Sequence, residues 1–225
     1  MEGALKTRAP TGAASPVRVS GAATGGIMPG MSTLEIVLAA GIGIGLASVA
    51  GVRAFLPLAL AALAARFGLL SLPAPLAFLS DWTVIGVLAA LAVAEVALDK
   101  LGALDRVLDG VMTPVRLASG ALLFAVALQS AFWVGAIPEL AAGGAIAGAV
   151  SVLKAVLRPP AAAEAAGVSD VFLSFVEDAI ALVGGVVAIL VPLVPLVFVA
   201  FFLFFLYRIR RRRAKKYGGL RILGD

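Results

Sequence analysis

Long apolar runs, separated by short stretches of charge, proline and glycine, dominate the chain after residue 30. The run at 181–206 is apolar at nearly every position, whereas a membrane β-strand would alternate apolar and polar side chains. Crossing a hydrocarbon core of about 30 Å takes roughly 20 apolar residues in a helix, and several runs reach that length. The pattern therefore predicts an all-α protein, a polytopic membrane helix bundle.

The first apolar run, at 34–64, is too long for one straight crossing. As a continuous helix it would be about 46 Å long at 1.5 Å per residue. Gly51, Arg53 and Pro57 lie in its middle, and Pro57 cannot donate a backbone hydrogen bond there. We therefore expect a broken first helix, with the discontinuity at 51–57.

The same pattern predicts five further helices, about six in all. One begins near Trp82, with Ser80 or Asp81 as its N-cap. The apolar stretch 171–207 is too long for one crossing, so Pro192 and Pro195 predict a hairpin between two helices. The charged segment 99–116 remains open as a loop or a re-entrant segment. The expected crossings are 34–64, 82–98, 117–136, 140–157 and the two halves of 171–207.

The two ends of the chain differ from its middle. Residues 1–30 are rich in Ala, Gly, Pro, Ser and Thr, which predicts a disordered N-terminal tail. Translation could begin at Met1 or at Met31, directly before the first apolar run. The expected organisation is a tail at 1–30, a transmembrane domain at 31–207 and a basic cytoplasmic tail at 208–225.

The amino-acid composition indicates that lipid surrounds the chain, and it limits which catalytic and metal-binding groups are present. Hydrophobic residues make up 62% of the chain, charged residues make up 14% and the mean hydropathy is +1.09, so lipid must surround most of it. The absence of Cys and His excludes thiolate nucleophiles, His-based acid–base catalysis and nitrogen or sulfur metal sites. We therefore expect no cofactor, and an enzyme would depend on carboxylates, hydroxyls, Lys or Arg.

The net charge of +5 reflects a basic cluster beyond the last apolar run, which suits anionic lipid headgroups better than nucleic acid. With six crossings, both termini and the segments 99–116 and 158–170 share one face. That face carries all Lys and Arg residues except Arg53 and Arg66, so the positive-inside rule makes it cytoplasmic. The residues expected at the lipid surface are Arg208, Arg210, Arg211, Arg212, Arg213, Lys215 and Lys216.

A weak internal sequence repeat divides the chain into two halves. Gly-x-x-x-Gly motifs at 41–45 and 144–148 precede Arg53-Ala-Phe-Leu and Lys154-Ala-Val-Leu, respectively. Two inverted three-helix halves, an architecture common among transporters, would explain it. The Gly motifs also predict close helix packing, and Gly-rich faces could support a homo-oligomer.

Charges within apolar segments are the candidate binding residues, because a lone cation there costs about 2.5–3.5 kcal/mol on insertion scales. Arg53 fits either an anion or headgroup contact at the broken helix or a structural ion pair. Glu95 and Asp99 stand four apart on one helical face, where they could hold a proton or a hard cation. We expect Arg53 and Glu95 to share one polar pocket. The candidate set is Arg53, Glu95, Asp99, Lys154 and Glu177.

Other charges have simpler interpretations. Asp105 and Asp109 repeat the spacing of four, but an exposed, solvated loop with local ion pairs is favoured for them. Glu177 and Asp178 are adjacent and point about 100° apart, so we expect one of them to face the bundle. Lys154 could join the binding site, but extension of its side chain to the cytoplasmic interface is favoured.

Several blocks in the chain resemble a known family. They are Gly51-Val-Arg-Ala-Phe-Leu-Pro-Leu58, Ala64-Ala-Arg-Phe-Gly68, Glu95 with Asp99, Leu104-Asp105 with Asp109, and Thr113-Pro114 ahead of Ser119-Gly120. The chain is similar over about 34–213 to the bacterial integral membrane family called domain of unknown function 4126. The resemblance implies a helical fold and a multi-pass inner-membrane location, and it implies no reaction.

Three functions are compatible with these residues. The first is a small-solute, ion or lipid-headgroup transporter that uses the buried Arg and Glu charges around a midplane site. The second is a non-catalytic membrane scaffold or assembly partner in which the same charges are structural pairs. A membrane enzyme is the weakest, because no phosphate-handling carboxylate pattern stands in an apolar context.

Overall fold

The computed structural model describes residues 32–99, 105–129, 136–157 and 170–218, and these ranges contain helices and no strand. The prediction of an all-α polytopic helix bundle is therefore confirmed. The elements, in chain order, are α1 (Thr33–Val52), α2 (Phe55–Arg66), the 3-10 helix η1 (Ala74–Ser80), α3 (Trp82–Asp99), α4 (Asp105–Ala127), α5 (Ile137–Leu157), α6 (Asp170–Leu190) and α7 (Leu193–Gly218).

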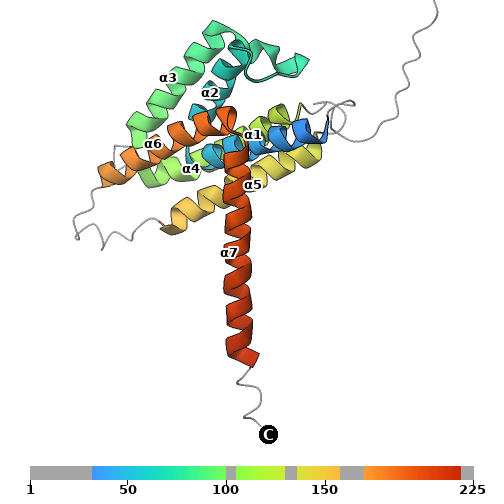
Figure 1. Cartoon of the computed structure of the whole chain (residues 1–225). Helices are drawn as coiled ribbons and strands as arrows, with labels where there is room; N and C mark the ends of the chain where they lie inside the picture. The colour runs from blue at the N-terminus through green and yellow to red at the C-terminus, as the bar shows by residue number, and fades with distance from the viewer. Residues whose placement is uncertain (1–31, 100–104, 130–135, 158–169, 219–225) are drawn as a thin grey trace, which may run out of the picture.

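Helix α1 is the centre of the bundle. It packs against α4, α5, α6 and the beginning of α7, while α2 and α3 form a pair that joins the body through α6 and α4. Figure 1 shows this arrangement, with α7 extending away from the other helices. The buried core is built from small and aliphatic side chains of several helices, among them Leu46, Ala61, Leu123 and Ala147.

Four helices are long and apolar enough to cross a membrane: α1, α3, Gly110–Ala127 of α4 and Ile137–Val156 of α5. Helices α6 and α7 pass the same test together, but they meet at a bend of 113°. The described residues thus give four spans, or five if the bent pair is one span. The expected count of six differs because it treats α6 and α7 as separate crossings.

The predicted break in the first apolar run is confirmed, and it falls at Arg53. Helix α1 ends at Val52, and Arg53 adopts an extended conformation with φ −136° and ψ 123°. In a continuous helix the ring of Pro57 would clash with the carbonyl of the residue four positions earlier, which is Arg53. In the first turn of α2, by contrast, Pro57 is tolerated because no intrahelical donor is needed there.

The chain reverses at this break, which was not predicted. Helix α1 runs antiparallel to α6, because Gly45 packs on Ala188 while Gly41, a turn earlier, packs on Pro192. Helix α2 leads away from Arg53 alongside α6, since its Leu60 lies against Gly185. The run 34–64 is therefore a helical hairpin with one long and one short arm, and not a single kinked crossing.

The segment 99–116 was left open as a loop or re-entrant segment, but its described part, from Asp105 on, is helical. Helix α4 begins at Asp105 and includes Pro114 within its length, then ends at Ala127. The expected helix 117–136 is thus shifted toward the N-terminus, and Trp133 lies outside the described residues. Helices α3 and α5 match their expected bounds closely.

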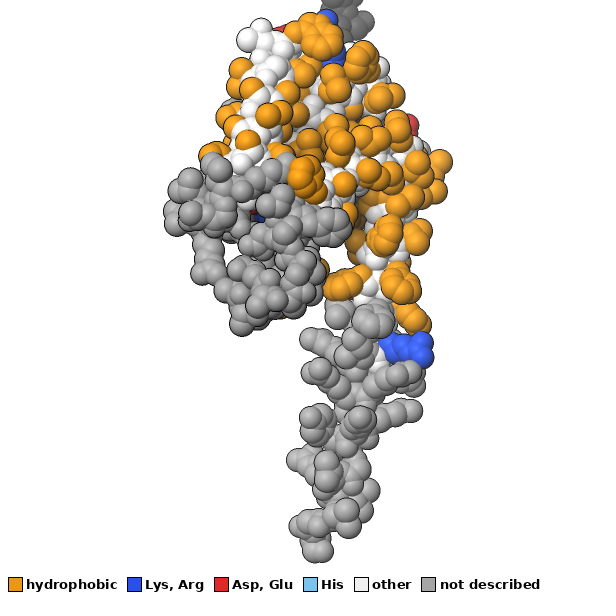
Figure 2. Space-filling view, turned by 90° about the vertical axis from the view of Figure 1, so that its left-hand side faces the viewer, with side chains coloured by type: hydrophobic (Ala, Val, Ile, Leu, Met, Phe, Trp, Pro, Cys, Tyr) orange, Lys and Arg blue, Asp and Glu red, His pale blue; other side chains and the backbone are white. Residues whose placement is uncertain are grey.

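Close helix packing at glycines, as predicted, occurs within the chain. A side chain at Gly41 would collide with the carbonyl of Pro192, and one at Gly45 would collide with Ala188. Between α4 and α5, Gly120 and Gly143 bring the two backbones together in the same way. The described outer surface is mostly apolar on the side drawn in Figure 2, as lipid contact requires.

Candidate functional site

The break at Arg53 leaves backbone carbonyl and N–H groups without helical hydrogen bonds, and polar side chains from other helices bind them on both sides of the break. On one side, the Ser151 hydroxyl of α5 donates to the carbonyl oxygen of Gly51 at 2.7 Å. On the other, the Glu95 carboxylate of α3 accepts from the backbone N–H of Ala54 at 2.9 Å and of Phe55 at 3.1 Å. Unpaired backbone groups are costly in an apolar interior, so these contacts fix the break in place.

Glu95 acts as the cap of α2, although it comes from another helix. It is 7% exposed, and its Oε1 also lies 4.0 Å from Nε of Arg116. The N-terminus of a helix attracts negative charge, and the first helix turn after a break is a common anion site. Here the carboxylate of Glu95 already occupies that position, which disfavours a bound anion at the break.

Arg53 is fully buried and joins three helices. Its Nη2 lies 2.6 Å from Oδ2 of Asp99 on α3 and 2.7 Å from Oδ1 of Asp178 on α6, and it donates to the Ser174 hydroxyl at 3.3 Å. Ser174 in turn donates to the same Asp99 oxygen at 3.0 Å. Two carboxylates from different helices therefore converge on one guanidinium nitrogen.

The rest of the guanidinium has unused donors. Among the described residues, Nε and Nη1 of Arg53 are buried and have no hydrogen-bond partner. A guanidinium offers five N–H donors in a fixed fork, and buried donors without acceptors are unfavourable. Arg53 can therefore still accommodate an acceptor, such as water or an oxygen atom of a small solute.

A second ion pair lies beside the first. Nζ of Lys154 on α5 is 2.8 Å from Oε2 of Glu177 on α6, and the two side chains are 8% and 17% exposed. Lys154 is therefore paired with a carboxylate of the neighbouring helix, and the favoured prediction that its side chain extends to the cytoplasmic interface stays a prediction. Both adjacent carboxylates of α6 contact cations of other helices, where one was expected to face the bundle: Glu177 pairs with Lys154, and Asp178 pairs with Arg53.

These side chains form one group, which we call the charge cluster: Arg53, Glu95, Asp99, Arg116, Lys154, Glu177 and Asp178. It lies where α1, α3 and α5 end and in the first turns of α6, with Arg116 contributed from the middle of α4.

All five candidate residues lie in the charge cluster. The expected proximity of Arg53 and Glu95 is present, because Glu95 binds the two backbone groups that follow Arg53. Sequence reasoning did not select Asp178, Ser174 or Ser151. The adjacent acidic pair on α6 was the one available signal, and it pointed to Asp178 as strongly as to Glu177.

The described residues include only some of the other positions for which the sequence made predictions. The side chains of Asp105 and Asp109 lie outside the described residues. Helix α7 continues to Gly218, so the basic segment is helical there, and Arg208 is exposed. Within the described part of the chain, no group of three or more His, Cys, Asp or Glu side chains could hold a metal ion.

A bundle of apolar helices with a buried charge cluster defines a polytopic α-helical membrane protein. The chain belongs to the family described as "Domain of unknown function (DUF4126)", whose model matches residues 38–212. The resemblance found in the sequence is therefore confirmed. No curated protein and no solved structure matches the chain significantly.

Proposed function

We propose that the protein is a transporter for a small polar solute, coupled to a proton or a monovalent cation, with the charge cluster as its binding site. The observation that carries the proposal is Arg53: it is fully buried, lies between two carboxylates and has buried donors at Nε and Nη1 without acceptors among the described residues. Intramembrane charges usually mark solute or ion pathways.

The convergence of two carboxylates on one guanidinium nitrogen supports coupling to a cation. The oxygens of Asp99 and Asp178 that contact Arg53 share a single nitrogen, so they lie close together. Two carboxylate oxygens at this separation offer the oxygen ligands that hard cations prefer. A solute with acceptor atoms would meet the remaining donors of Arg53, while the bound cation would balance the charge.

The described contacts also support a mechanism of coupling. Arg53 connects α1 with α3 and α6, and a cation bound at Asp178 would weaken the contact between Arg53 and α6. Neutralising one side of an ion pair changes how tightly the two helices hold together. Binding or release of the cation would thus shift the equilibrium between two positions of α6. Alternating access requires an equilibrium of this kind between two arrangements of the helices.

For orientation, we propose that the cluster end faces the cytoplasm in a bacterial inner membrane. Lys100, Arg106 and Arg158 adjoin that end in sequence, and the positive-inside rule favours it. Helix α7 would return the basic tail to the same side, where its Lys and Arg residues would attract anionic lipid headgroups. The direction of α1 supports the opposite face for Thr33, in place of the expected cytoplasmic N-terminus.

The proposal is tested with the purified full-length protein in liposomes, by measuring currents under an imposed pH gradient. The probes are a panel of amino acids, small carboxylates and sugars. We expect at least one solute to evoke a proton current that empty liposomes lack, that Asp178→Asn abolishes and that Asp81→Asn retains. Asp81 is an exposed carboxylate outside the cluster, so its variant is a matched control.

The alternative function, a non-catalytic scaffold, has an observation of its own. Lys154 and Glu177 already pair inside the chain, and Glu95 already caps α2, so these charges could serve only to tie helices together. Gly-rich faces would then support assembly with a second copy or another membrane protein. Wild-type protein that gives no solute-dependent current over the whole panel would favour this function and contradict transport.

A further inference from the structure

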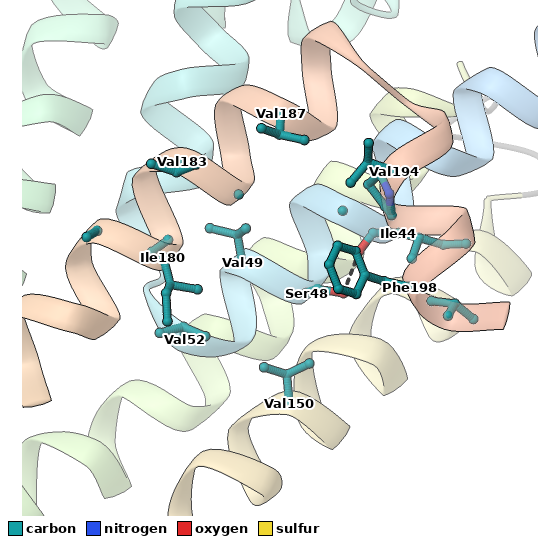
Figure 3. A pocket seen from close by; sticks show the side chains of 16 residues that line it. Ile44, Ser48, Val49, Val52, Val150, Ile180, Val183, Val187, Val194 and Phe198 are labelled. Atoms are coloured by element: carbon teal, nitrogen blue, oxygen red, sulfur yellow. Dashed lines mark hydrogen bonds between the residues drawn. The ribbon is translucent and has the colours of Figure 1, made fainter. Parts of the chain in front are cut away.

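An apolar groove lies between helices α1, α5, α6 and the first turns of α7. Its volume is about 690 Å³, within the range of roughly 300–1,000 Å³ that is usual for small-molecule sites. Figure 3 shows Val49 and Val52 of α1, Ile180 and Val183 of α6 and Phe198 of α7 around this space.

The wall of the groove offers almost nothing to a polar ligand. The hydroxyl of Ser48 is its one described side-chain polar group, and this hydroxyl donates to the carbonyl of Ile44 at 2.7 Å. Gly45 and Gly184 add no side chain to the wall, and Gly45 packs closely against Ala188 and Pro195. A surface of this kind, on helices that are themselves candidate spans, suits a hydrocarbon chain.

One end of the groove is charged. Val150 of α5 lines the groove, and Lys154 stands one turn further along the same face. On α6, Ala181 lines the groove and Glu177 stands one turn further, toward the same end. The ion pair between Lys154 and Glu177, at 2.8 Å, therefore closes the end of the groove nearest the charge cluster.

We propose that this groove binds the acyl chain of a zwitterionic phospholipid, with its headgroup at the Lys154–Glu177 pair. A phosphoethanolamine headgroup carries a phosphate that complements Lys154 and an ammonium that complements Glu177. An anionic headgroup would complement only Lys154 and would be repelled by the adjacent carboxylate of Glu177. The site is distinct from the basic tail of α7, where attraction depends on anionic lipid.

This inference does not require transport, so its test measures bound lipid and not flux. Full-length protein is reconstituted into nanodiscs that contain equal amounts of phosphoethanolamine and phosphoglycerol lipids with identical acyl chains. After gentle extraction into detergent, native mass spectrometry counts the retained lipids of each type. We expect wild-type protein to retain the phosphoethanolamine lipid preferentially.

Two neighbouring substitutions on α6 test the groove. Val183→Trp fills it, whereas Leu182→Trp places the same bulk on a residue outside the lining; both native side chains are exposed, at 59% and 47%, so both variants should fold. We expect the first to lose the retained lipid and the second to keep it. Equal retention in both variants, or a wild-type groove filled by a second copy of the chain, would overturn the proposal.

A charge variant tests the headgroup. Replacing both members of the pair, Lys154→Gln with Glu177→Gln, avoids leaving either charge alone in the interior. We expect the preference for phosphoethanolamine over phosphoglycerol lipid to fall about tenfold, because charge-assisted hydrogen bonds contribute on this order to affinity. An unchanged preference, or a wild-type preference for the anionic lipid, would contradict the assignment of the headgroup to this pair.

Discussion

At the scale of single residues, the main question is how a fully buried arginine is stabilised. Transferring a charge into an apolar interior is costly, and the cost is offset only by close opposite charges and hydrogen bonds. Arg53 has both, from Asp99, Asp178 and Ser174. The same reasoning implies that each partner depends on Arg53, so these residues should behave as one unit.

Glu95 should contribute to stability through the helix N-terminus that it caps. Glu95→Ala removes the acceptor for the buried N–H of Ala54 and the partly buried N–H of Phe55, and an unsatisfied buried group costs about 1–3 kcal/mol. We therefore expect this variant to lower the free energy of unfolding by about 2–5 kcal/mol, measured by reversible unfolding in mixed micelles.

The amide variant separates capping from charge. Glu95→Gln keeps one oxygen acceptor and should lose less than Glu95→Ala, as conservative caps do. Equal stability of wild type and Glu95→Ala would show that the two backbone contacts are not made.

The sequence was sufficient to select five charged residues that the structure brings together, but it could not assign their contacts. An apolar run that contains Arg53 or Glu95 must bury or pair the charge, which identifies both residues without a structure. Which carboxylate meets which cation depends on helix rotation and direction. For that reason the adjacent residues Glu177 and Asp178 could not be distinguished, and the capping role of Glu95 left no local pattern.

At the scale of helices, the break after α1 was predictable and the reversal was not. Pro57 prevents a continuous helix through Arg53, and that effect is local. The direction of α2 after the break depends on its packing against α3 and α6, which are distant in sequence. The helical segment that begins at Asp105 was missed for a similar reason, because its charges and Pro114 are typical of a loop.

Glycines in α1 should tolerate no side chain where α6 and α7 meet it. A methyl group at Gly41 would collide with the backbone carbonyl of Pro192, whereas at Gly86 on α3 it would meet open space. We expect Gly41→Ala to lower the free energy of unfolding by about 1–3 kcal/mol, the usual cost of overpacking.

Gly86→Ala is the matched control for that substitution. It should be neutral or stabilise the protein by up to about 1 kcal/mol, because alanine has the higher helix propensity. Thermal unfolding in detergent compares the two. A Gly41→Ala variant as stable as Gly86→Ala would mean that the α6–α7 turn does not pack on α1.

At the scale of the whole molecule, the arrangement of α1 determines which segments share a face. Helices α1 and α3 both end at the charge cluster, so Ser32 and Asp99 lie at opposite ends of the bundle. Because the chain is free of cysteine, single-cysteine variants need no other change. We expect Ser32→Cys and Gly102→Cys to react with an impermeant thiol reagent from opposite sides of the membrane.

The same labelling experiment has an internal check. Pro138→Cys, at the start of α5, should label from the same side as Ser32→Cys, because α5 also ends at the cluster. Labelling of Ser32→Cys and Gly102→Cys from one side would mean that residues 34–64 form one broken crossing and α3 a second crossing back, and it would contradict the hairpin at Arg53.

The central claim, that Arg53 and its carboxylates form one buried unit at the reversal, is tested most directly by a double-mutant cycle. The measured quantity is the free energy of unfolding of wild type, Arg53→Gln, Asp178→Asn and the double variant in mixed micelles. The account predicts that the double variant loses less than the sum of the single losses, by about 1–3 kcal/mol, because each single change strands a buried charge. A control cycle with the exposed Asp81→Asn should be additive within about 0.5 kcal/mol. Additivity between Arg53 and Asp178 as well would contradict the account.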